Sequence, residues 1–113
     1  SASGGNKDGY SIRIATKELL KRPERAKVLF ILSDGLPTDY SGGSTVAMND
    51  VRAAVAEARK KGIQVVAIMF GDADYIAMTG KDYDYMYGFN IIKCAPQDIG
   101  RKIIPIIKSI VMQ

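Results

Sequence analysis

The chain has 113 residues, of which 47% are apolar and 25% charged, a composition typical of one globular domain with its own core. It contains no histidine and one cysteine, Cys94, which excludes an internal disulfide and argues against a structural zinc site or histidine-assisted nucleophilic catalysis. Any bound metal is therefore expected to be a hard cation held by oxygen atoms, as Mg²⁺ is.

The charge and hydropathy patterns disfavour nucleic acid and membrane as partners. The net charge is only +4, and the basic residues cluster at 17–27 and 59–61, near the ends of predicted helices, where cations complement the helix dipole. A nucleic-acid-binding surface would favour aromatic residues between the basic ones, and these two clusters contain none. No apolar run reaches the roughly 18 residues that a membrane span needs, and no signal peptide is recognisable. We expect a cytoplasmic protein.

The first half of the chain predicts two helices that flank a strand. Residues 1–5 (SASGG) are expected to be a cloning remnant or part of a glycine-rich loop. Apolar residues at helical spacing predict a helix over residues 10–21. An apolar strand at 27–32 and a helix at 44–61 follow, and Gly62 ends that helix.

The second half continues the alternation of strand and helix. A strand is predicted over residues 63–70, a short helix plus loop over 73–88, a strand over 90–94 and a last helix through residue 111. Tyr83, Tyr85 and Tyr87 are interpreted as partly buried loop aromatics rather than as a ligand-stacking surface. The expected fold is α/β: a Rossmann-like, three-layer parallel sheet of about three strands with four helices.

The most informative segment is the one that follows the first apolar strand. Ser33, Asp34 and Gly35 end the run abruptly, and Asp39 adds a second carboxylate to the same loop. Ligands gather at the carboxyl ends of strands in open parallel sheets, which favours a binding role for Asp34 over a simple turn. Ser33 fits either a hydroxyl that satisfies the loop backbone or support for a bound water. Asp39 fits either a water-mediated contact or a cap.

These motifs, taken together, resemble the carboxyl-terminal half of a von Willebrand factor A domain, of the type found in the cobaltochelatase T subunit and the nitric oxide reductase activation protein. The resemblance rests on the order Asn6-x-Asp8-Gly9, helix, Arg22-Pro23-Glu24, apolar strand, Ser33-Asp34-Gly35-x-Pro37-x-Asp39. It implies a metal-ion-dependent adhesion site with Mg²⁺ at the top of the sheet. Asp34 matches one ligand loop of that site, and Asn6, with Asp8 nearby, occupies the place of the family's threonine.

The chain departs from the family pattern in one large respect, because no DxSxS loop occurs in it. The resemblance therefore implies that residues 6–113 form the carboxyl-terminal half of a domain, with a weakened metal site. On this interpretation the strand at 28–32 is exposed, and it pairs with a second copy in a homodimer or with the missing half.

The resemblance implies a binding module rather than an enzyme. Such modules work beside AAA+ ATPases of the MoxR kind, in metal insertion into, or activation of, a client metalloprotein. One alternative is a Mg²⁺-dependent phosphoryl-transfer hydrolase, although no DxDx motif or phosphate-binding loop is present. Another is a structural domain whose metal site has decayed.

Overall fold

The structure, a computed structural model, describes residues 2–5, 8–33 and 43–112, and within them four parallel strands form one sheet in the order β1-β2-β3-β4. The parallel α/β fold predicted from the sequence is confirmed. The elements in chain order are β1 (Ala2–Gly5), α1 (Gly9–Leu20), β2 (Val28–Ser33), α2 (Gly43–Lys60), β3 (Gln64–Phe70), α3 (Ala73–Tyr87), β4 (Ile91–Cys94), the 3₁₀ turn η1 (Pro96–Asp98) and α4 (Ile99–Val111).

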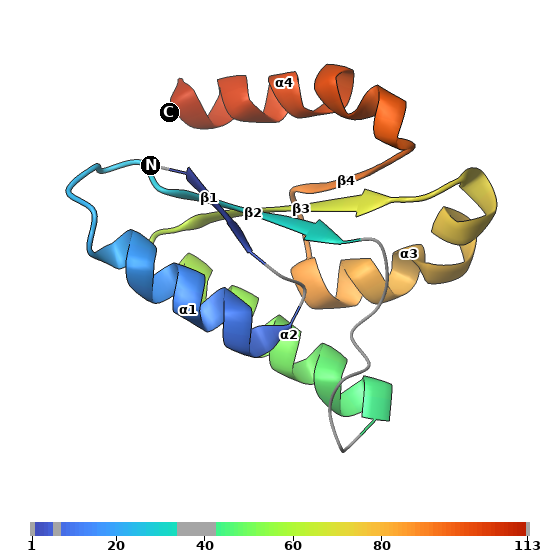
Figure 1. Ribbon diagram of the computed structural model, residues 1–113, viewed down its shortest axis with the longest axis horizontal. Coiled ribbons are helices and arrows are strands. Elements are labelled where there is room, and N and C mark those ends of the chain that lie inside the picture. The colour runs from blue at the N-terminus through green and yellow to red at the C-terminus, as the bar shows by residue number, and fades with distance from the viewer. Residues whose placement is uncertain (1, 6–7, 34–42, 113) are drawn as a thin grey trace.

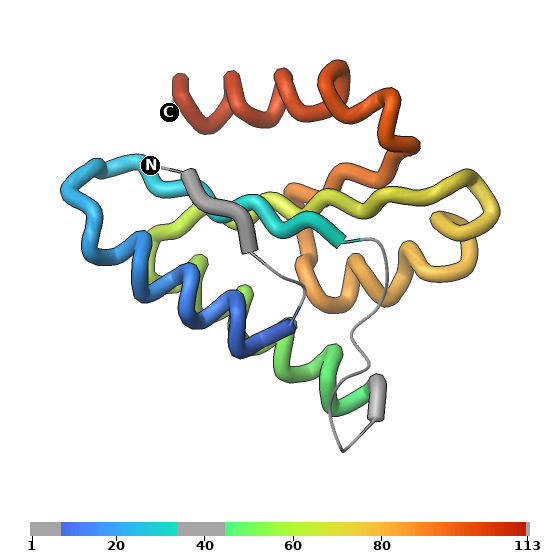
Figure 2. The backbone as a smooth tube through the Cα atoms, viewed as in Figure 1, coloured from blue at the N-terminus to red at the C-terminus, as the bar shows by residue number. Residues whose placement is uncertain are grey.

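The helices cover the two faces of the sheet unequally. Helices α1, α2 and α3 lie together on one face, while α4 lies alone on the other (Figure 1). Each connection from one strand to the next moves one place in the same direction across the sheet, so right-handed crossovers put all three connecting helices on one side. The chain leaves that side only after β4, as the path of the tube shows (Figure 2). The predicted three-layer arrangement follows from this.

The alternation of side chains along the strands divides the core into two clusters. Leu29, Ile31 and the odd-numbered residues of β3 pack with α1, α2 and α3. Val66 and Ile68 of β3 face the opposite way and pack with Ile92, Cys94 and Ile110 under α4. Both faces of β3 are buried, and its sequence is continuously apolar from residue 65 to residue 70, as is typical of a central parallel strand.

The strand β1 differs from the expectation that residues 1–5 are a loop or cloning remnant. Residues 2–5 pair in parallel with residues 28–31 of β2, and β2 pairs on its other side with β3. The prediction that strand 28–32 is an exposed edge, available to a second copy, is therefore wrong for the described structure. Serine and glycine have low strand propensity, so this strand gives no sequence signal; main-chain pairing with β2 forms it.

Helix α3 is the second difference. The sequence predicted a short helix and a loop, whereas residues 73–87 form one continuous helix. Tyr83 and Tyr87 are 0% and 1% exposed, and they lie one helical turn apart on the buried side. Tyr85 lies on the exposed side of the same helix. The interpretation of these tyrosines as loop residues is thus wrong for all three, and that of partial burial is wrong for Tyr83 and Tyr87.

The helix boundaries follow the signals in the sequence. Gly62 adopts a φ of 88°, a left-handed conformation that suits glycine directly after α2. Helix α4 continues through Pro105 and buries Ile110 against the sheet. In the part of the chain that the structure describes, none of the helices has the length and apolar character needed to cross a membrane.

Candidate functional site

The carboxyl ends of the strands meet at one edge of the sheet, which we call the carboxyl edge. Because the strands are parallel, Gly5 at the end of β1, Ser33 at the end of β2 and Phe70 at the end of β3 all lie there. The segments that follow lead into helices whose amino ends face the same edge. This is where ligands bind in open parallel sheets.

Two aspartates at this edge act as helix caps. The Asp8 carboxylate accepts a hydrogen bond from the Ser11 backbone N–H at 2.7 Å and caps α1. The Asp72 carboxylate accepts one from the Tyr75 N–H at 2.8 Å and caps α3. Such caps satisfy backbone donors that the first helical turn leaves without partners. For Asp8 the cap is a structural role at the position predicted to support the metal.

Ser33 is held by a side chain from a distant part of the sequence. It is buried, and its hydroxyl lies 2.8 Å from the hydroxyl of Tyr83 on α3. The contact ties the last residue of β2 to the middle of α3. Neither interpretation offered for Ser33 from the sequence included this partner. Tyr83 is a supporting residue that the sequence analysis missed, because the two residues are 50 positions apart.

The remaining predicted ligands, Asn6, Asp34 and Asp39, lie outside the described residues. Among residues 2–5, 8–33 and 43–112, no three Asp, Glu, Cys or His side chains come together in a group that could hold a metal ion. The described structure does bring Asp8 and Ser33 to the ends of neighbouring strands. Carboxylate and hydroxyl oxygens are hard donors, and this donor set fits Mg²⁺ rather than a soft metal.

The amino end of α1 is fixed to α2 by close packing and ion pairs. A Cβ on Gly9 would overlap Oδ2 of Asp50, so this approach of the two helices requires glycine or a shift of the Asp50 side chain. Arg13 bridges two carboxylates of α2, at 3.1 Å from Glu57 and 2.8 Å from Asp50. These hydrogen bonds, first to Glu57 and then to Asp50, raise the pKa of Arg13. The same guanidinium lowers the pKa of Glu57. The segment that carries Asp8 is therefore anchored on rigid elements.

Comparison with known proteins agrees with this fold. The family model for the von Willebrand factor type A domain matches residues 1–81. Protein YojO of Bacillus subtilis is 34% identical over 106 residues, which are 93% of this chain and 16% of YojO. Protein NorD of Brucella suis is 43% identical over 63 residues, which are 53% of this chain and 10% of NorD. No solved structure gives a significant match.

The chain thus spans less than a fifth of the curated relatives that it matches, at 16% of YojO and 10% of NorD. The family match covers the helix α1, the central strands β2 and β3 and the carboxyl edge between them. The parallel sheet and the extent of this match lead to one conclusion: the chain belongs to the von Willebrand factor type A domain family.

Proposed function

We propose that this chain is a protein-binding module whose carboxyl edge holds a divalent cation, with Asp34 as its main protein ligand. The observation that carries the proposal is the position of Ser33, the residue before Asp34, at the end of a central parallel strand in a chain of this family. Asp8 follows the neighbouring strand and supports the same edge, with Asn6 and Asp39 as further oxygen donors. On this proposal the chain is a protein-binding module and not an enzyme.

The proposed cation is Mg²⁺, which would supply a positive charge with an open position for a carboxylate of the partner protein. Side chains of the described residues fix the elements next to the proposed cation. Asp8 fixes the start of α1 through its cap, and the contact between Ser33 and Tyr83 fixes the end of β2 against α3. The described parts of β2, α1 and α3 pack on a shared core, which holds the end of β2 and the start of α1 in place.

The partner proposed for the longer protein is an AAA+ ATPase of the MoxR kind, with a metalloprotein as client. The similarity to the NorD proteins supports this proposal, as does the resemblance of the motifs to the nitric oxide reductase activation protein and the cobaltochelatase T subunit. The buried free thiol of Cys94 is consistent with a cytoplasmic location.

The proposal predicts that partner binding depends on a divalent cation and on Asp34. In the full-length protein, EDTA or Asp34→Ala should weaken binding of the ATPase by at least roughly thirtyfold, since losing one partner of a buried charge pair costs about 2–5 kcal/mol. Surface plasmon resonance with immobilised ATPase measures this.

The matched control is Glu18→Ala, which removes an exposed carboxylate from the other end of α1 and should leave the affinity unchanged. Binding that survives both EDTA and Asp34→Ala would contradict the proposal. Hydrolysis of a phosphate ester by the wild type, lost in Asp34→Ala, would instead favour the hydrolase alternative.

A further inference from the structure

The strand β4 has an open side. It is the last strand in the sheet order, and no other described strand pairs with its outer side. Its inner side bonds to β3, since the carbonyls of Asn90 and Cys94 accept from the N–H groups of Ala67 and Gly71. Backbone groups alternate in direction along a parallel strand. The N–H and C=O groups of Ile91 and Lys93 therefore point to the open side.

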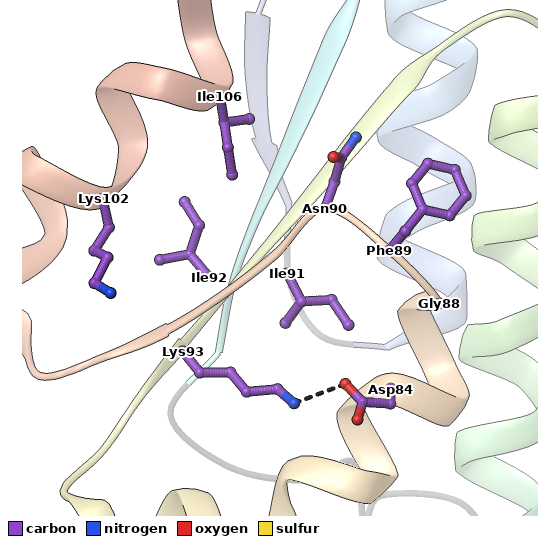
Figure 3. Close-up of a pocket in the computed structure, with 9 residues that line it drawn as sticks. All are labelled: Asp84, Gly88, Phe89, Asn90, Ile91, Ile92, Lys93, Lys102 and Ile106. Carbon is purple, nitrogen blue, oxygen red and sulfur yellow. Dashed lines mark hydrogen bonds and ion pairs between the residues drawn. The ribbon is translucent and has the colours of Figure 1, made fainter. Parts of the chain in front are cut away.

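A groove lies against this open side. It has a volume of about 510 Å³ and is formed by β4, the end of α3 and one side of α4. Lys102 and Ile106 of α4 border it on the side of Ile92, and Asp84 of α3 borders it on the side of Lys93 (Figure 3). An extended segment that entered this groove would find backbone partners on β4 and walls on both faces.

The charge of the groove favours an acidic occupant. The ammonium of Lys93 lies 2.7 Å from the Asp84 carboxylate, so these two charges compensate each other (Figure 3). The side-chain ammonium of Lys102 has no hydrogen bond or ion pair with any residue in the described ranges 2–5, 8–33 and 43–112. The lining therefore carries one uncompensated positive charge, on the side of α4.

An apolar contact lies at the start of the groove. Phe89 is 60% exposed, yet its ring is held in place by the guanidinium of Arg59, 3.8 Å from the ring centroid. Ile91 lies beside it and is only partly buried. A rigid exposed aromatic ring next to an open strand is the kind of contact that anchors a bound peptide.

We propose that the edge of β4 is a second docking site, which binds an extended acidic peptide as an additional strand of the sheet. The peptide bonds to the outward N–H and C=O groups of Ile91 and Lys93. Because side chains alternate along a strand, its carboxylates face Lys102 on one side and its apolar residues face Phe89 on the other. A second copy of this chain fits less well, because pairing two β4 edges would bring two positively charged grooves together.

The probe that tests this proposal is a fluorescein-labelled peptide of about eight residues in which valine and glutamate alternate, a length that covers an ordinary strand. Fluorescence anisotropy with the full chain should show saturable binding. The control peptide has the same side chains but carries N-methyl groups on alternate backbone nitrogens, in both possible registers. Loss of the strand hydrogen bonds should weaken its binding by about tenfold. Equal affinity for the methylated peptides would overturn the proposal.

Two protein variants test whether the positive charge of Lys102 contributes to peptide binding. Lys102→Glu should weaken binding of the acidic peptide by about fivefold and strengthen binding of a peptide with lysine in place of glutamate. Lys108→Glu makes the same change at an exposed position of α4 that does not line the groove, and should have no effect. Equal effects of the two variants would overturn the proposal, as would a dimer in light scattering that the peptide does not dissociate.

The proposed site is independent of the carboxyl edge. Binding of the valine–glutamate peptide should therefore be the same in Mg²⁺ and in EDTA, and the same in wild type and Asp34→Ala. This separates its outcome from that of the cation-dependent function proposed above.

Discussion

Replacing Arg59 with alanine is expected to lower the free energy of unfolding by about 2–4 kcal/mol, because three backbone carbonyls then lose a charged donor, and two of these hydrogen bonds are partly buried. Arg59 lies on α2 and donates to the carbonyls of Val65 at 3.1 Å and Phe89 at 2.8 Å, and also to that of Tyr87. One side chain thus joins α2 to β3 and to the turn between α3 and β4. Partial burial of the guanidinium lowers the pKa of Arg59.

Urea denaturation of two further variants distinguishes the loss of the Arg59 hydrogen bonds from the loss of a positive charge alone. Arg59→Lys should recover less than half of the stability, because an ammonium cannot reproduce the planar fork of donors. Arg52→Ala is the matched control on the same helix. Arg52 also lies over an aromatic ring, 4.5 Å from the centroid of Tyr85, and donates to one carbonyl, but it is exposed. Its loss should cost about 1 kcal/mol or less. Equal losses in the free energy of unfolding for Arg59→Ala and Arg52→Ala would contradict the stabilising role of the Arg59 hydrogen bonds.

Truncating Tyr83 should be the other large effect. Tyr83→Ala removes a fully buried ring from the core between α3 and the sheet, at an expected cost of about 3–5 kcal/mol. Tyr83→Phe keeps the ring and removes only the hydroxyl that contacts Ser33, so it should cost about 1 kcal/mol. The difference between the free energies of unfolding of the two variants gives the contribution of ring packing apart from that of the hydrogen bond.

The control for Tyr83 is Tyr85→Ala, two positions along the same helix. Tyr85 is 44% exposed, so its removal should change the midpoint of urea denaturation far less. If Tyr85→Ala and Tyr83→Ala were equally destabilising, the orientation of α3 described above would be wrong.

The elements with strong local signals were predicted closely. The helix expected at 44–61 is Gly43–Lys60, and the strand expected at 63–70 is Gln64–Phe70. Both have a clear period or a continuous apolar run, bounded by glycine. The strand β1 could not be predicted, because serine and glycine give no strand signal and only pairing with β2 forms it. Helix α3 was partly missed, because tyrosines at alternate positions hide its helical period.

The candidate site, like the fold, could be predicted only in part from the sequence. The placement of Ser33 at the carboxyl edge followed from the order of strands and helices, and that of Asp8 from the resemblance to the family. The contact between Ser33 and Tyr83, and the approach of Gly9 to Asp50, could not be read from the sequence. Both depend on how α3 and α2 pack against the sheet, which tertiary contacts decide. The groove beside β4 is likewise visible only once β4 is known to be the last strand.

The central claim, that a divalent cation binds at the carboxyl edge of the sheet, is tested most directly by NMR with Mn²⁺, a paramagnetic ion that takes the same hard oxygen ligands as Mg²⁺. Substoichiometric Mn²⁺ is predicted to broaden the amide signals of Asp8 and Ser33 selectively. The signals of Glu18 and Gly62, at the opposite edge, should stay sharp, and Asp34→Ala should abolish the broadening. Broadening that is absent, or that is centred on residues away from Asp8 and Ser33, would contradict the account.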